Sequence, residues 1–70
     1  MSVTIMDILE NAEYYLEGDG RMWPIAKDQL HNAITLLNKG YSLHNTVDVD
    51  FLVRQCGSIE DVPDKEDADV

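Results

Sequence analysis

The sequence predicts an all-α protein made of an antiparallel helical hairpin, a short third helix and a disordered acidic C-terminal tail. Two long stretches repeat their apolar residues with the period of a helix. A short turn rich in glycine separates these stretches, which is typical of two antiparallel helices. The last part of the chain is dominated by Asp and Glu and has few apolar residues.

The first helix is expected to begin just after Thr4. Either Ser2 or Thr4 can serve as its N-cap, and Asp7 follows Thr4 at the distance of a capping box. At about 100° per residue, the apolar side chains form one narrow stripe: Ile5, Ile8, Leu9, Ala12 and Leu16. Gly18 is expected to end the helix in a left-handed conformation, and the polar residues after it complete a turn.

The second helix is expected from Pro24 to Lys39. Proline suits the first helical turn, while Lys39 and Gly40 give the other end a cation and a glycine cap. Its apolar residues cover about half of the helix circumference, which is more than one neighbouring helix needs: Ile25, Ala26, Leu30, Ala33, Ile34, Leu36 and Leu37. This helix should therefore be the central one, packed on two sides.

Residues 46–56 carry two overlapping patterns. Alternate positions are apolar, as in a strand: Val47, Val49, Phe51 and Val53. The same segment is consistent with a helix, because Asp50 lies four residues before Arg54 and acidic residues favour a helix start. A helix is favoured, since a single strand has no obvious partner in this chain. The helical interpretation leaves Val47 and Phe51 uncovered.

The composition changes after Gly57. Residues 58–70 contain six acidic side chains and one cation, Lys65. Their apolar residues are too sparse to offset the entropy of ordering, and Pro63 interrupts any helix. We therefore expect a small helical domain at residues 1–57 and an acidic disordered tail at residues 58–70.

Charge and length exclude several classes of function. The 70 residues hold 14 Asp and Glu against 5 Lys and Arg, a net charge of −9, which disfavours direct binding to nucleic acid. A chain of this size with no catalytic, nucleotide-binding or cofactor motif is not expected to be an enzyme. His31, His44 and Cys56 lack the paired spacing of metal ligands. With no long apolar run and no basic leader, we expect a cytoplasmic protein without a membrane partner.

The first helix carries the most informative charges. Its acidic residues and one tyrosine fall on a single arc with no basic residue among them: Asp7, Glu10, Glu13, Tyr14 and Glu17. Such neighbours repel each other by a few tenths of a kcal/mol per pair. An ordinary solvated helix face is one interpretation. The other is an anionic recognition surface for a basic protein or nucleoprotein complex, with Tyr14 as an anchor among the carboxylates.

In size and charge the chain resembles the small acidic phage-encoded inhibitors of restriction and CRISPR systems, several of which mimic DNA. This compositional resemblance implies an inhibitor or regulator that blocks a nucleic-acid-handling partner, either as a DNA mimic or by steric blocking. The alternative hypothesis is an assembly module that forms a homodimer, or docks on a larger subunit, through the apolar face of the second helix or through Val47 and Phe51.

Overall fold

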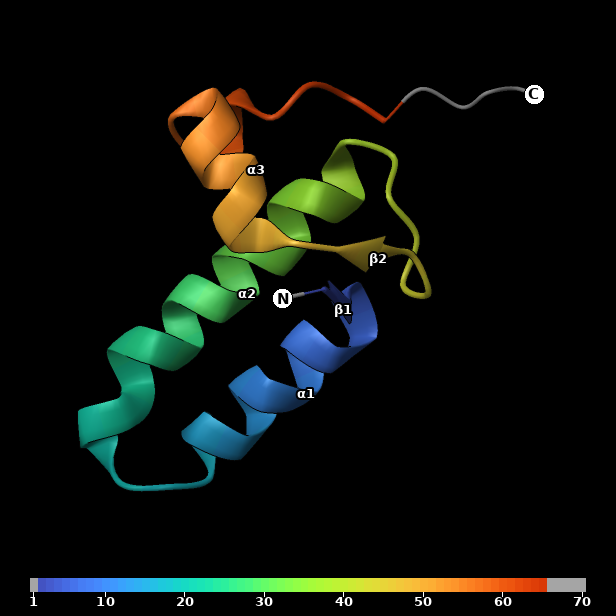
Figure 1. Cartoon of the computed structure of the whole chain (residues 1–70). Helices are drawn as coiled ribbons and strands as arrows, with labels where there is room; N and C mark the ends of the chain where they lie inside the picture. The colour runs from blue at the N-terminus through green and yellow to red at the C-terminus, as the bar shows by residue number, and fades with distance from the viewer. Residues whose placement is uncertain (1, 66–70) are drawn as a thin grey trace.

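The computed structural model describes residues 2–65 and confirms the all-α fold class (Figure 1). Three α-helices dominate, and two short 3-10 helices and a minor two-stranded sheet accompany them. In chain order the elements are β1 (Val3–Thr4), α1 (Ile5–Leu16), η1 (Gly20–Met22), α2 (Trp23–Asn38), β2 (Thr46–Val47), α3 (Val49–Cys56) and η2 (Ile59–Asp61).

The start of α1 is the predicted capping box. The hydroxyl of Thr4 accepts a hydrogen bond from the Asp7 N–H at 3.0 Å, and the Asp7 carboxylate accepts one from the Thr4 N–H at 3.1 Å. The end of α1 differs from the prediction, because the glycines with a positive φ in residues 2–65 are Gly40 and Gly57, not Gly18. The chain instead turns through η1, which Asp19 caps.

Small residues form the contact between α1 and α2, which lie side by side and antiparallel (Figure 1). Ala12, Ala26 and Ala33 are all fully buried. Alanine lets the two helix backbones approach closely, while larger residues such as Ile5 and Leu36 fill the wider end of the hairpin. The second helix thus packs against α1 along the hairpin, and against η2 on a second side.

The third element contains both predicted patterns in succession. Val49–Cys56 form α3, which Asp48 caps by accepting the N–H of Phe51 at 3.1 Å. Just before it, Thr46–Val47 form a strand that pairs antiparallel with Val3–Thr4. The strand partner that seemed to be missing is therefore the N-terminal segment. Val47 is buried by this pairing at 5% exposure, whereas Phe51 remains 52% exposed.

The structured part of the chain extends beyond the predicted domain boundary at residue 57. Ile59 and Val62 are 6% and 1% exposed and belong to the hydrophobic core. The Nζ of Lys39 donates to the carbonyl of Glu60 at 2.9 Å, and the N–H of Lys65 donates to the Lys39 carbonyl at 2.7 Å. Residues 58–65 are thus part of the fold and not of a disordered tail, and the remaining residues of the predicted tail, 66–70, lie outside the described residues.

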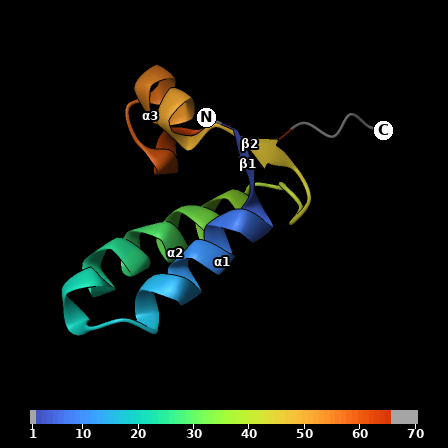
Figure 2. The ribbon, with the colours of Figure 1, turned by 60° about the horizontal axis from the view of Figure 1, so that its bottom comes forward.

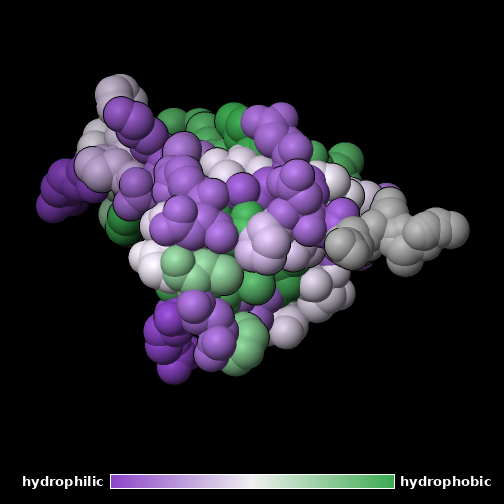
Figure 3. All heavy atoms as spheres, turned by 90° about the horizontal axis from the view of Figure 1, so that it is seen from above, coloured by the Kyte–Doolittle hydropathy of each residue, from purple (hydrophilic) through white to green (hydrophobic). Residues whose placement is uncertain are grey.

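The molecule has two layers. Figure 2 shows α3 lying over one face of the layer made by α1 and α2. No element among residues 2–65 covers the opposite face of the hairpin. Figure 3 views the end with α3 and shows mainly hydrophilic surface, with apolar surface along the upper edge, which is the back of Figure 1.

Candidate functional site

The predicted partner-binding residues share one exposed surface of α1, here called the acidic face: Asp7, Glu10, Glu13, Tyr14 and Glu17. All five side chains are exposed, and α1 contains no Lys or Arg. The buried residues Ile5, Ile8 and Ala12 hold the opposite side of the helix against the core. The hydrophobic stripe of α1 therefore orients the acidic face toward solvent.

Two of these carboxylates lie where the helix itself disfavours them. Glu17 is the C-cap residue of α1 and Glu13 lies in the last turn, next to the negative end of the helix dipole. A negative charge there typically costs about 0.3–1 kcal/mol, and a cation would be favourable. Helix stability thus gives no reason for acidic residues at these two positions.

Asp7 has a structural role in addition to its charge. Its carboxylate accepts the Thr4 N–H, so one of its oxygens is already engaged in the capping box. Replacing Asp7 would therefore change helix stability together with surface charge. Glu10, Glu13 and Glu17 are the better positions at which to test the charge alone.

Tyr14 projects from the acidic face and is 72% exposed. Its ring meets Tyr15 edge to face, with the ring centroids 5.7 Å apart and an interplanar angle of 66°. This contact restrains the Tyr14 ring without burying it. An aromatic side chain held in this way can bury a large area on a partner at low entropic cost.

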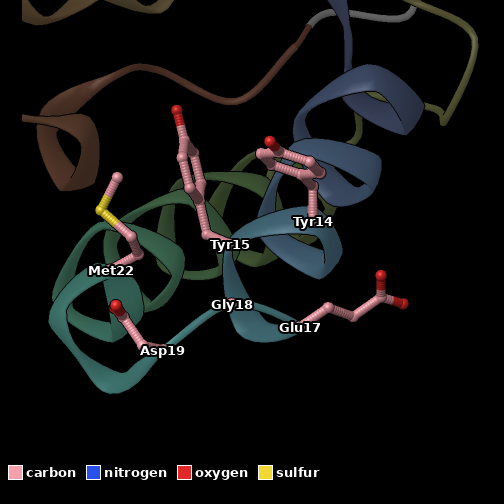
Figure 4. A pocket seen from close by; sticks show the side chains of 6 residues that line it. All are labelled: Tyr14, Tyr15, Glu17, Gly18, Asp19 and Met22. Atoms are coloured by element: carbon pink, nitrogen blue, oxygen red, sulfur yellow. The ribbon is translucent and has the colours of Figure 1, made fainter.

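A shallow depression of about 400 Å³ lies at the end of the acidic face, next to the hairpin turn. Figure 4 shows the Tyr15 ring standing between Met22 and Tyr14, while the Glu17 carboxylate points away. Asp19 also lines the depression, and its carboxylate pairs with Arg21 at 2.8 Å. The hydrogen bond from the Arg21 side chain lowers the pKa of Asp19. The site thus combines carboxylates with an aromatic and thioether surface.

The structure also shows a second surface, here called the open apolar face, of which the sequence interpretation named only the part contributed by the second helix. It lies on the uncovered side of the hairpin, and its apolar residues come from both helices: Met6, Leu9, Leu16, Trp23 and Leu30. Ile34 is exposed and follows Leu30 by four residues, which puts it on the same side of α2. Trp23 at the start of α2 is 56% exposed and lines this face. The sequence signal for this face was the apolar arc of α2, which is wider than one neighbouring helix needs.

A third cluster links α2 to the C-terminal segment, away from the acidic face. His31 on α2 hydrogen-bonds the carboxylate of Glu60 in η2. This bond lowers the pKa of Glu60. Among residues 2–65, no group of three or more His, Cys, Asp or Glu side chains could hold a metal ion.

Comparison with protein-family models, curated proteins and solved structures finds no match to this chain. In the part of the chain that the structure describes, no helix has both the length and the apolar character that a membrane span requires. The geometry of the acidic face and of the open apolar face is therefore the basis for the functional conclusions.

Proposed function

We propose that this chain is a small acidic binding protein that inhibits or regulates a basic, nucleic-acid-handling protein or nucleoprotein complex. The acidic face is the binding surface, and the chain acts in the manner of the anti-restriction and anti-CRISPR inhibitors it resembles in size and charge. The partner is blocked either because the carboxylates stand in for phosphates or because the bound protein obstructs the site sterically.

The observation that carries this proposal is the placement of exposed carboxylates on α1 without any cation. Glu13 and Glu17 lie at the end of the helix where acidic residues are unfavourable, so stability does not account for them. A net charge of −9 gives the chain a long-range field that attracts a basic surface. Binding to such a partner accounts for a charge pattern that costs the free protein stability.

The mechanism follows from the chemistry of cationic grooves. Lys and Arg side chains that neutralise phosphates bind carboxylates by the same charge-assisted hydrogen bonds. Long-range attraction raises the association rate, and Tyr14 adds apolar contact once the surfaces meet. Binding should therefore weaken steeply as salt increases, because mobile ions screen exposed charges beyond a Debye length of about 8 Å at physiological salt.

The test is affinity capture from a lysate of the native host, comparing wild type with the triple variant Glu10→Lys, Glu13→Lys, Glu17→Lys. A matched control reverses three exposed acidic residues outside the acidic face: Asp28, Asp61 and Asp64. Both variants change the net charge equally, so a difference between them reports the position of the charges. Captured proteins are eluted across a salt gradient and identified by mass spectrometry.

The proposal expects wild type and the control variant to capture the same basic nucleic-acid enzyme or complex, and moderate salt to release it. The variant reversed on the acidic face should capture none of it. If the triple variant captured the same partner as wild type, the acidic face would not be the binding surface. Equal loss of binding in both variants would attribute binding to net charge alone and would contradict the assigned face.

A further inference from the structure

The open apolar face is a surface of the hairpin that no element among residues 2–65 covers. Leu16, Trp23 and Ile34 on this face are 46%, 56% and 53% exposed. Two depressions of about 420 and 580 Å³ share Leu16 and Leu30, so they form one continuous groove between α1 and α2. Half of the buried residues of α1 and α2 are alanines, namely Ala12, Ala26 and Ala33, whereas the bulky side chains of Leu16, Trp23 and Ile34 lie outside the core.

The spacing of the residues on this face is that of a helical bundle. In α1 the positions follow one another at steps of three, four and three residues: Met6, Leu9, Glu13 and Leu16. In α2 the steps are four, three and four residues: Trp23, Lys27, Leu30 and Ile34. Alternating steps of three and four keep side chains on one face toward a neighbouring helix that crosses at about 20°. A layer of two helices with this pattern fits a second layer of two helices.

The charges on this face are self-complementary. The groove is lined by Glu10 and Glu13 on α1 and by Lys27 on α2, and neither Glu13 nor Lys27 has an ion pair within the described part of the chain. A two-fold axis that lies between the two faces and runs parallel to the helices places Glu13 of one copy near Lys27 of the other, twice per dimer. Asp7, Tyr14 and Glu17 do not line the groove, so two copies would not press them together.

We propose that the open apolar face is the interface between two copies of this chain, which pair as an antiparallel four-helix bundle. The apolar residues exposed in the monomer form the centre of the bundle, and the two α3 helices lie on its outer sides. Of the acidic face, Asp7, Tyr14 and Glu17 flank the bundle and remain accessible, whereas Glu10 and Glu13 lie along the interface. Because each copy carries a net charge of −9, salt should strengthen this association, which is the opposite of its effect on a basic partner.

Sedimentation velocity over a wide range of protein and salt concentrations tests the proposal. Wild type should shift from its monomer mass of 7.9 kDa to twice that mass, at lower protein concentration when salt is high. The double variant Leu16→Lys, Ile34→Lys should stay monomeric. Both residues are about half exposed, so this variant should fold, and its circular dichroism should match that of wild type. Two controls at exposed positions outside the face, Ile25→Lys and Phe51→Lys, should dimerise like wild type.

A mixing experiment tests the charge pair directly. Glu13→Lys and Lys27→Glu should each weaken their own homodimer about tenfold, because two like-charged contacts replace two ion pairs. An equimolar mixture of these two variants restores both pairs across the interface, and it should dimerise about as well as wild type. An ion pair within one chain would give no recovery on mixing, so recovery supports the interface between copies.

Three outcomes would overturn the proposal. In the first, wild type remains monomeric at every protein and salt concentration. If a basic amphipathic peptide binds the groove under the same conditions, the open apolar face would be assigned to a partner helix. In the second, the double variant Leu16→Lys, Ile34→Lys still dimerises. In the third, it still dimerises and Phe51→Lys does not. Either of the last two results would place the interface elsewhere.

Discussion

Replacing Ile59 with alanine tests whether the segment after α3 is part of the core. Ile59 is 6% exposed and packs in one cluster with Ile5, Ile8 and Leu36. The change removes three carbon atoms, and at about 0.8 kcal/mol for each this loses about 2.4 kcal/mol of transfer free energy. The cavity left behind adds to this loss, so we expect a decrease of about 3 kcal/mol in the free energy of unfolding.

This loss is large compared with the stability of so small a domain. A core of this size typically supplies about 3–5 kcal/mol, so Ile59→Ala should leave the protein close to half unfolded or only marginally folded at 25 °C. In urea, with a slope of about 1 kcal/mol per molar, the unfolding midpoint should fall by about 3 M or disappear. The assay is urea unfolding followed by circular dichroism, with all proteins at the same concentration so that self-association affects them equally.

The matched control is Ile25→Ala. Ile25 is 41% exposed and lies in α2, where alanine is also the better helix former, so this change should cost about 1 kcal/mol or less. If Ile59→Ala cost no more than Ile25→Ala, the segment at residues 59–62 would not belong to the core. The reasoning that extends the fold past residue 57 would then be refuted.

Two further predictions concern the capping box and the loss of folding stability at low pH. Thr4→Ala should lower the free energy of unfolding by about 1 kcal/mol, because the Asp7 N–H loses its acceptor. Thermal melts would show this as a lower melting temperature than that of Ser2→Ala, a control at an exposed position. Equal melting temperatures of the two variants would contradict the prediction. Hydrogen bonds lower the pKa of Asp19, Asp48 and Glu60 in the folded state, the last chiefly through His31. Stability should therefore be fully present above the unfolded pKa values of about 3.8–4.5 and should decrease as pH falls below them. In urea titrations over this pH range, Glu60→Gln should flatten the decrease, and an unchanged pH profile would exclude the His31 contact as a contributor.

Local signals in the sequence predicted the helices well. The capping box of Thr4 and Asp7 and the glycine after α2 act within a few residues, so the chain alone determines them. The Gly18 prediction failed for a reason that is also local. Asp19 offers a competing cap for η1 through the Arg21 N–H, and glycine then needs no left-handed conformation.

The features that the sequence did not predict depend on contacts between distant residues. Val3 pairs with Val47, and only the segment that begins at Val47 showed a strand pattern, because the two residues of its partner strand are too few to show one. Ile59 and Val62 are sparse in an acidic segment, but they enter a core whose other residues come from the hairpin. The acidic face followed directly from helical periodicity, whereas the open apolar face required knowing which side of the hairpin α3 covers.

The makeup of the core has a consequence for synthesis of the protein on the ribosome. Ile5 and Ile8, near the beginning of the chain, share one cluster with Ile59 and Val62, near the end of the described part. The first helix is therefore synthesised well before the residues that complete its environment. Until Val62 has been made, the hairpin can form only as a partly stabilised intermediate with exposed apolar side chains. Truncated translation products should consequently be targets for proteolysis, because they lack the last part of the core.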